Sequence, residues 1–223
     1  MELVVAETAR AAARALSGRI TVLARQAMGR RGVCNLLVGS GPECPALFAA
    51  LVDTEIFWGR VNVFQADELV VAAGDPRRSS VALVDELADQ VGLPPGRLHL
   101  VDPAGADPAG VLRRHAAALP ERLDVVVVGI GDDGRVTGWD DDAVLAAPEP
   151  FALTDDRAGS AGDPVRRIVV TPAGVTRAEH RFALVCGAER ADALARLQLP
   201  AAGSAADALA PLIVHADRAA AGG

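Results

Sequence analysis

The stretch VVVVGIGDDGRVTG, residues 125–138, carries two carboxylates and one guanidinium in a glycine-rich turn that follows a run of valines. A carboxylate such as Asp132 or Asp133 can accept a proton from water or from a carbon acid. Arg135 cannot, because a guanidinium with a pKa above about 12 stays protonated at neutral pH. Carboxylates without a nearby histidine would need further oxygen ligands to hold a metal ion. The turn therefore predicts acid–base or anion-stabilising chemistry rather than a metal site.

A second glycine turn lies in LLVGSGPE, residues 36–43. Gly39, Ser40 and Gly41 join a predicted strand to a predicted helix, where backbone N–H groups and a hydroxyl suit a phosphate. The turn is not a Walker A loop, because no GK[ST] follows, and it lacks the third glycine of the dinucleotide fingerprint. The alternative is a glycine turn that serves only the packing of the strand against the helix. The residues of this turn alone leave both interpretations open.

A pair of carboxylates, Asp67 and Glu68, stands where another apolar strand ends. Ligands of open parallel sheets bind at the carboxyl ends of the strands. One of these carboxylates can therefore lie over a ligand while the other supports it from behind. The alternative is that one side chain caps the next segment and the other is solvated.

Apolar runs of strand length alternate with segments of helical period along the chain, which predicts an α/β fold with a mostly parallel sheet. Most of these runs are apolar almost throughout, as expected of strands covered on both faces. Strands are predicted at 33–39, 60–65, 97–101, 124–130, 166–171, 181–187 and 211–216, and helices at 5–27, 45–53, 79–91, 107–118, 188–197 and 203–209. Residues 140–165 form the longest irregular stretch and are predicted to be a mobile loop.

The composition restricts the classes of protein and of partner. A chain of 223 residues, 51% of them hydrophobic, can bury a full-sized core. No linker divides it, so residues 1–223 are predicted to form a single domain. The formal net charge of −7 argues against nucleic-acid binding, which depends on clustered positive charge, and favours a small-molecule partner.

The N-terminal residues lack the pattern of a signal peptide, and the apolar runs stop short of the roughly 20 residues of a membrane span. We therefore expect a soluble, cytoplasmic protein with no membrane contact. Cys34, Cys44 and Cys186 fit neither a disulfide framework nor a zinc site, and are expected to be buried small residues. The sequence gives no indication of a metal or an organic cofactor.

Taken together and in this order, the motifs resemble the 6-phosphogluconolactonase family, within the superfamily that includes glucosamine-6-phosphate isomerase (deaminase). The resemblance is carried by Gly39 to Pro42 (the phosphate turn), Trp58 with Ala66 to Leu69 (a GDER-like motif), Ser79 and Ser80, Gly129 to Gly138 (the GMGEDGHTAS loop), Pro164 to Thr171 (PxxRITLT), Gly187 to Leu194 (GEEKAEAL) and Asp217 to Ala221 (DEAAA). It covers nearly the whole chain. It implies a Rossmann-like three-layer sandwich with a mostly parallel sheet.

The resemblance also implies a ligand and the residues that bind it. The ligand is a phosphorylated sugar, and its phosphate is expected on Gly39, Ser40 and Gly41. Arg167 occupies the family's arginine position, and Arg190 replaces the usual lysine; either guanidinium can hold a phosphate through two hydrogen bonds. A surface ion pair is the alternative for Arg167. The oligomeric state stays open, with a homodimer as one option.

Arg135 departs from the family, whose histidine at this position is the expected general base. Asp67 aligns with the proton-abstracting aspartate of the deaminase branch, and Asp133 aligns with the aspartate beside the missing histidine. Either carboxylate can activate water or take a C2 proton, and Arg135 can stabilise the developing oxyanion. His99, His115, His180 and His215 are each expected to be structural. Leu69, which replaces the arginine of GDER, and the pair Gly138-Trp139 indicate an altered sugar pocket.

Three functions follow from these residues. The favoured one is a 6-phosphogluconolactonase-like hydrolase of the pentose phosphate pathway type, with altered catalysis, acting on a phosphorylated sugar lactone. The second is a glucosamine-6-phosphate isomerase or deaminase that depends on Asp67. The third is a noncatalytic sugar-phosphate binder that has kept the anion site and lost the base.

Overall fold

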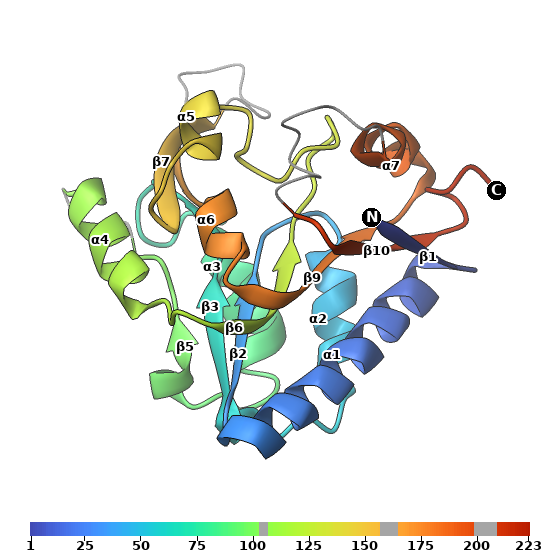
Figure 1. The fold of residues 1–223 in the computed structure, drawn as a ribbon, viewed down its shortest axis with the longest axis horizontal. Helices are drawn as coiled ribbons and strands as arrows, with labels where there is room; N and C mark the ends of the chain where they lie inside the picture. Colours follow the sequence, from blue (N-terminus) through green and yellow to red (C-terminus); the bar gives the residue numbers. More distant parts are fainter. Residues whose placement is uncertain (103–106, 157–164, 199–208) are drawn as a thin grey trace.

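The computed structural model of the chain describes residues 1–102, 107–156, 165–198 and 209–223. Its main sheet has seven strands, and every neighbouring pair runs parallel. In spatial order the strands are β1 (Glu2–Ala6), β10 (Leu212–Asp217), β9 (Ala178–Val185), β6 (Leu123–Val128), β2 (Cys34–Val38), β3 (Val61–Gln65) and β5 (Leu98–His99). The predicted fold class, an α/β sandwich with a mostly parallel sheet, is confirmed (Figure 1).

A second, antiparallel sheet of three strands accompanies the main one, in the order β4 (Asp67–Leu69), β8 (Val165–Val170) and β7 (Phe151–Asp156). The helices are α1 (Ala9–Arg31), α2 (Cys44–Val52), α3 (Ser79–Ala82) with its continuation η2 (Leu83–Ala88), α4 (Pro108–Ala118), α5 (Asp142–Leu145), α6 (Pro172–Val175) and α7 (Ala191–Gln198). Short single turns are η1 (Trp58–Arg60), η3 (Pro95–Arg97) and η4 (Ala188–Arg190). None of the described helices is both long enough and apolar enough to cross a membrane.

The two faces of the main sheet are buried in two separate hydrophobic clusters. Leu36 and Val38 of β2 lie in the cluster that includes α1, α2 and η2, whereas Leu37 lies in the cluster that includes α4, α6, α7 and the small sheet. The valines of β6 alternate in the same way. Because successive side chains of a strand point to opposite faces, a strand covered on both sides needs apolar residues at every position. This explains the unbroken apolar runs of the sequence.

The N-terminal segment differs from its prediction. A helix was expected from residue 5, but Glu2–Ala6 forms the edge strand β1, and α1 begins at Ala9. Thr8 ends the strand segment and caps the helix, because its side-chain oxygen accepts a hydrogen bond from the backbone N–H of Ala11. The partner of β1 is β10, from the other end of the chain, and the two termini lie near each other in Figure 1. This long-range pairing is not visible in local periodicity.

Residues 140–165 were predicted to form one irregular stretch, and the structure differs from this prediction. They contain the helix α5 and the strand β7, and β7 pairs antiparallel with β8. Each predicted strand overlaps an observed one, but the strand predicted at 166–171 corresponds to β8 and belongs to the small sheet. Most of the predicted helix at 203–209, and residues 157–164 of the predicted mobile loop, lie outside the described residues.

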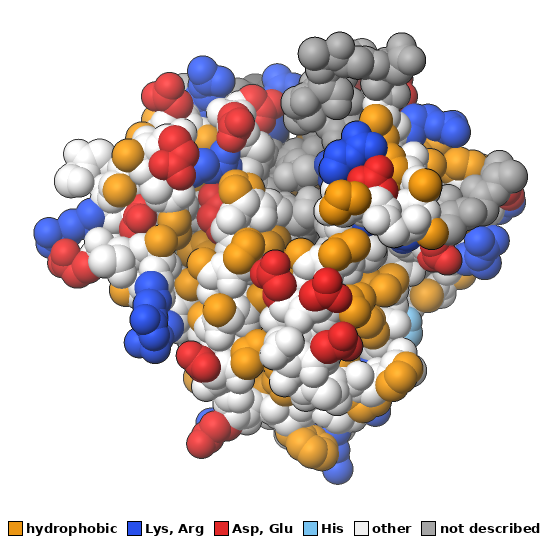
Figure 2. All heavy atoms as spheres, turned by 180° about the vertical axis from the view of Figure 1, so that it is seen from behind, with side chains coloured by type: hydrophobic (Ala, Val, Ile, Leu, Met, Phe, Trp, Pro, Cys, Tyr) orange, Lys and Arg blue, Asp and Glu red, His pale blue; other side chains and the backbone are white. Residues whose placement is uncertain are grey.

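The surface seen in Figure 2, the back of the view in Figure 1, shows basic side chains dispersed among acidic and apolar ones. On this face they do not gather into a patch of one sign. The cysteines are free thiols, of which Cys34 is buried and Cys44 and Cys186 are half-buried. Burial raises the pKa of each of the three thiols to about 12, so they stay protonated at neutral pH.

Candidate active site

The two glycine turns come together at the carboxyl ends of the neighbouring strands β2 and β6. The backbone N–H of Gly39 donates to the carbonyl of Val127 at 2.8 Å, which extends the pairing of the strands by one residue. A Cβ added at Gly39 would lie 2.9 Å from the backbone nitrogen of Gly129, and one added at Gly129 would overlap the carbonyl oxygen of Ser40. Both positions therefore require glycine. Their contact places the Ser40 turn directly beside the acidic turn.

A cleft of about 570 Å³ opens between these turns. Its lining residues are Ser40, Gly41, Pro42, Ile130, Gly131, Asp132, Asp133, Val136, Thr137, Gly138, Trp139, Asp140, Arg167 and Arg190. The predicted phosphate residues Ser40, Gly41, Arg167 and Arg190 thus line the same cleft as Asp133. Gly39 lies at the base of the turn, against Gly129.

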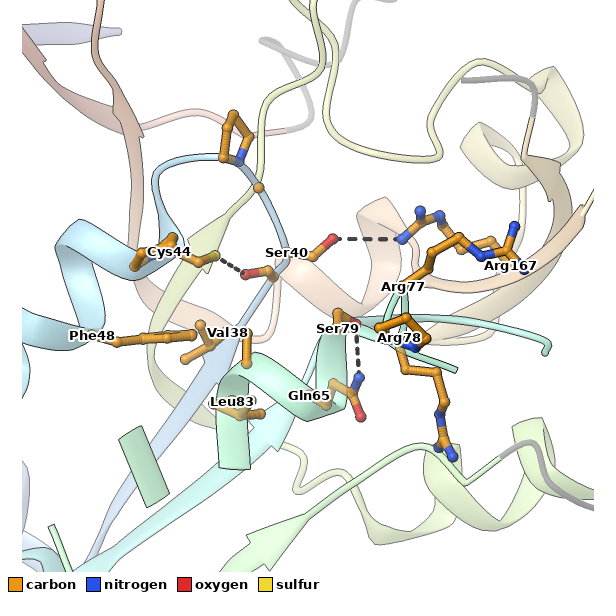
Figure 3. Close-up of a pocket in the computed structure, with 16 residues that line it drawn as sticks. Val38, Ser40, Cys44, Phe48, Gln65, Arg77, Arg78, Ser79, Leu83 and Arg167 are labelled. Carbon is orange, nitrogen blue, oxygen red and sulfur yellow. Dashed lines mark hydrogen bonds between the residues drawn. The ribbon is translucent and has the colours of Figure 1, made fainter. Parts of the chain in front are cut away.

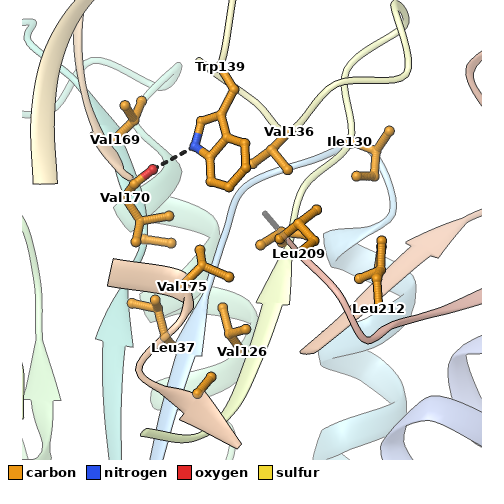
Figure 4. Close-up of a cluster of buried hydrophobic side chains, with 14 of the residues drawn as sticks. Leu37, Val126, Ile130, Val136, Trp139, Val169, Val170, Val175, Leu209 and Leu212 are labelled. Carbon is orange, nitrogen blue, oxygen red and sulfur yellow. Dashed lines mark hydrogen bonds between the residues drawn. The ribbon is translucent and has the colours of Figure 1, made fainter. Parts of the chain in front are cut away.

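One wall of the cleft is the buried indole of Trp139. Its Nε1 donates to the carbonyl of Val170 at 2.7 Å, which fixes the ring against the small sheet (Figure 4). The preceding Gly138 has a φ of 80°, and a Cβ at this position would collide with Val169. The pair Gly138-Trp139 is therefore set by close packing, and both residues line the cleft; the altered sugar pocket stays a prediction.

Asp67 lies behind the cleft, at the start of β4, with 3% of its surface exposed. One carboxylate oxygen accepts from the backbone N–H of Ser40 at 2.7 Å, and the other accepts from the Ser40 hydroxyl at 2.5 Å and from the Arg167 guanidinium at 2.5 Å. Arg167 reaches this position because β4 and β8 are paired, with Leu69 opposite Arg167. Both oxygens of Asp67 are therefore engaged in holding the turn and the arginine.

Glu68, the second carboxylate of the pair, is fully buried. It accepts hydrogen bonds from the backbone N–H groups of Ser79 at 2.9 Å and Ser80 at 3.1 Å, at the start of α3, and from Nε of Arg78 at 3.3 Å. Glu68 therefore caps the segment that begins at Ser79, as the alternative interpretation of this carboxylate pair predicted. The same interpretation expected the other carboxylate to be solvated. Asp67 and Glu68 are instead both buried and hydrogen-bonded to protein groups, as buried charges require.

Arg190 lies in η4, just after β9, and only 3% of the residue is exposed. Its Nε donates to Glu43 at 3.1 Å, and its two terminal nitrogens donate to Asp132 and to the carbonyl of Ile130. Burial raises the pKa of the Glu43 carboxyl, and the positive charge of Arg190 opposes that rise. Glu43 precedes α2, so the first turn of this helix and the acidic turn are joined through one guanidinium.

Asp133 and Arg135 of the acidic turn differ in their relation to the cleft. Asp133 lines the cleft, and its Oδ1 accepts from the backbone N–H of Arg135 at 2.9 Å. The Arg135 side chain is 57% exposed, with its Nε 3.9 Å from Oδ2 of Asp133. It is not among the described residues that line the cleft. The turn is closed behind them by a bridge between Ile130 and Val136.

A second cavity, of about 270 Å³, lies on the other side of the Ser40 turn (Figure 3). Val38, Phe48 and Leu83 supply its apolar wall. Ser40 and Arg167 line both cavities, with the guanidinium 3.5 Å from the Ser40 hydroxyl. The Ser40 turn therefore borders both cavities, and polar groups line each of them.

The described residues that line the 570 Å³ cleft include no histidine. His115 is buried, with Nε2 2.8 Å from the carbonyl of Gln65 and its ring edge-on to Phe151. His99 stacks on Phe64, and His215 lies in β10 near Phe182. His180 lies in β9, 3.7 Å from Glu179. A proton acceptor in this cleft must therefore come from its carboxylates.

The sequence missed three ion pairs that the structure brings together. Glu43 and Asp132 were not expected to share Arg190, and Asp67 was not expected to hold Arg167. No local signal could have found these pairs, since each joins residues that are far apart in the chain. Among the described residues, no group of three or more His, Cys, Asp and Glu side chains has the arrangement of a metal site.

The fold and the site define an α/β protein with a cleft lined by Arg167 and Arg190 at the carboxyl edge of a parallel sheet. The chain matches the model of the family described as glucosamine-6-phosphate isomerases/6-phosphogluconolactonase over residues 7–216. It belongs to that family.

Relatives and solved structures agree with this assignment. The chain is 27% identical to the 6-phosphogluconolactonase of Streptomyces coelicolor, over 91% of this chain and 87% of that protein. It is 32% identical to the 6-phosphogluconolactonase of Mesorhizobium japonicum, over 72% and 70% respectively. The crystal structure of 6-phosphogluconolactonase from Thermotoga maritima shares the fold with a TM-score of 0.84, at 16% identity over 97% of this chain and 98% of that one. A monomeric glucosamine-6-phosphate deaminase also shares it, with a TM-score of 0.83 at 15% identity over 100% and 99%.

Proposed function

We propose that this chain hydrolyses the lactone of a phosphorylated sugar acid, the reaction named in its 6-phosphogluconolactonase relatives. The observation that carries the proposal is the convergence of Ser40, Arg167 and Arg190 with Asp133 in one cleft. The Ser40 turn and the two guanidinium groups form the phosphate end. Backbone N–H groups and arginine side chains are the donors that bind phosphate most effectively. The ligand in this proposal is a sugar phosphate.

The proton acceptor in this proposal is Asp133. Arg135 cannot accept a proton, and both oxygens of Asp67 already accept strong hydrogen bonds from Ser40 and Arg167. Asp133 lines the cleft, its side chain is 49% exposed, and only its Oδ1 holds the backbone of the turn. It therefore meets water in the cleft with an oxygen that is not committed to the backbone.

The reaction then proceeds in two steps. Asp133 takes a proton from water while the water oxygen bonds to the lactone carbonyl carbon, which produces a tetrahedral oxyanion. The oxyanion re-forms the carbonyl as the ring carbon–oxygen bond breaks, and the ring oxygen takes the proton back from Asp133. Arg135, at the rim of the turn, is the candidate cation for the negative charge of the intermediate.

The deaminase alternative has less support in this geometry. It requires Asp67 to take a proton from C2 of an amino-sugar phosphate, and a proton on Asp67 would disrupt the ion pair with Arg167. The binder alternative keeps the same phosphate end and differs only in turnover.

The test is the hydrolysis of freshly generated 6-phosphogluconolactone, corrected for its spontaneous opening. The expected result is hydrolysis above the buffer rate by the wild type and by Asp140→Asn, a variant of an exposed carboxylate in the same cleft. A wild type that binds 6-phosphogluconate but gives only the buffer rate would make the protein a binder and overturn the proposal.

A further inference from the structure

The three acceptors that surround the Arg190 guanidinium differ sharply in burial. The side chain of Arg190 is 4% exposed and that of Glu43 is 8% exposed, whereas the side chain of Asp132 is 99% exposed. The third acceptor is the backbone carbonyl of Ile130. A buried cation of the cleft is therefore covered, on its solvent side, by one fully exposed carboxylate.

Of these acceptors, Asp132 is the one that can leave. Withdrawing Glu43 from Arg190 would leave a charge unpaired in the interior, which is strongly unfavourable. The carbonyl of Ile130 is fixed by the bridge between Ile130 and Val136. The Asp132 carboxylate can turn into water and be hydrated there, and ion pairs with an exposed partner are weak.

Arg190 and Asp132 both line the cleft, together with Ser40 and Arg167, so a phosphate on the Ser40 turn lies in the same cleft as their ion pair. We propose that Asp132 is an internal stand-in for the substrate phosphate: it neutralises Arg190 in the empty cleft and is displaced when a phosphorylated ligand binds. This inference rests on the proposed function, since it takes the cleft as the phosphate site.

The exchange makes Asp132 a determinant of the affinity for phosphorylated ligands. A ligand must interact with Arg190 more strongly than one carboxylate does before it can displace Asp132. A phosphate dianion meets this condition through its charge and its additional oxygens, whereas an unphosphorylated sugar acid does not. Asp132 therefore lowers the affinity for a phosphorylated ligand by the factor needed to open its ion pair with Arg190, and it does not affect a ligand that leaves the pair intact.

The experiment compares the wild type, Asp132→Asn and Asp140→Asn by isothermal titration calorimetry with 6-phosphogluconate and with unphosphorylated gluconate. Asp140 is a matched control because it is an exposed carboxylate of the same cleft. Among the described residues it forms no ion pair with Arg190. Both variants remove one negative charge from the same cleft, so general electrostatics affects them alike. Unchanged melting temperatures are expected, because both side chains are exposed.

The expected result is that Asp132→Asn binds 6-phosphogluconate roughly fivefold more tightly than the wild type, and Asp140→Asn less than about twofold more tightly. The affinity for gluconate should change by less than about twofold in Asp132→Asn, because gluconate has no phosphate to displace Asp132. Equal tightening in both variants, or no tightening in Asp132→Asn, overturns the inference. Absence of binding by all three proteins overturns the phosphate site itself, whereas binding without lactone hydrolysis overturns the proposed function alone.

Discussion

Asp67 and Arg167 form an ion pair between the paired strands β4 and β8, with 2.5 Å between a carboxylate oxygen of Asp67 and a guanidinium nitrogen of Arg167. Their side chains are 4% and 12% exposed. The same carboxylate oxygen accepts from the hydroxyl of Ser40. The pair thus connects the small sheet to the phosphate-type turn after β2, and it has a structural role whether or not Asp67 takes part in catalysis.

Removal of Asp67 is expected to destabilise the fold. Asp67→Ala leaves Arg167 without this partner and the Ser40 turn without its acceptor, so we expect a loss of about 3 kcal/mol in the free energy of unfolding. Urea denaturation measures this loss in the free energy of unfolding. Asp141→Ala, which removes an exposed carboxylate, is the control, with a loss of roughly 0.5 to 1 kcal/mol because Asp141 caps α5. A loss for Asp67→Ala no larger than this would show that the pair contributes little.

Gly129→Ala is expected to separate the two glycine turns. A Cβ there overlaps the carbonyl oxygen of Ser40, and neither backbone can move without breaking the hydrogen bond between Gly39 and Val127. We expect a loss of more than about 2 kcal/mol in the free energy of unfolding, together with weaker binding of 6-phosphogluconate.

Gly18→Ala provides the matched control for that substitution. Gly18 lies inside α1, and a Cβ there would meet nothing within 4 Å, so this variant should gain about 0.5 to 1 kcal/mol through its helix propensity. Stability losses of similar size in both variants would contradict the close contact of the turns.

Asp133→Asn is expected to lower kcat for lactone hydrolysis by about 100-fold, because the amide cannot accept the proton of water. KM should change little, since Asp133 does not contact Arg167 or Arg190 in the described ion pairs. Steady-state kinetics with Asp140→Asn as control separates the two parameters. An unchanged kcat would show that another group is the base.

Arg135→His is expected to raise kcat by roughly 10-fold or more. A neutral imidazole accepts a proton at pH 7 and a guanidinium does not, so the variant adds a base two residues along the turn from Asp133. The gain should appear as pH rises through about 6.5, where imidazole loses its proton. Arg135→Gln, which removes the charge without adding a base, is the control. Rates of both variants equal to that of the wild type would place residue 135 outside the chemistry.

Acidification below neutral pH is expected to destabilise the protein through its histidines. Burial lowers the pKa of His99, His115, His180 and His215 below the ordinary value of 6.5. The unfolded chain then binds more protons than the folded one, so stability is lost as pH falls through about 6.5. Urea denaturation at pH 7.5 and 5.5 should show this loss.

His115→Gln tests the contribution of one of the two buried imidazoles, His115 and His215. Glutamine keeps a donor for the carbonyl of Gln65 and removes the titrating group, so the loss of stability between pH 7.5 and 5.5 should be smaller than in the wild type. An identical loss in this variant would assign the effect to other groups.

Sequence reasoning identified six of the seven strands of the parallel sheet and predicted which residues carry the chemistry. A strand buried on both faces must be apolar throughout, and a tight turn at its carboxyl end needs glycine, so LLVGSG and VVVVGIG indicate both features locally. The guanidinium of Arg135 cannot act as a general base, and this conclusion follows from the sequence alone. The order of the motifs indicated the family to which the chain belongs.

The tertiary structure alone decided which charged groups meet. The edge strand β1 exists because β10 pairs with it, and β7 and β4 exist because β8 lies between them. Asp67 is held by Arg167, and Arg190 is shared by Glu43 and Asp132, for the same reason. Periodicity and propensity describe a residue and its neighbours within a few positions, whereas these partners are brought together only when the sheets assemble. The strength and availability of each charge in the cleft therefore depend on contacts that no local stretch of sequence contains.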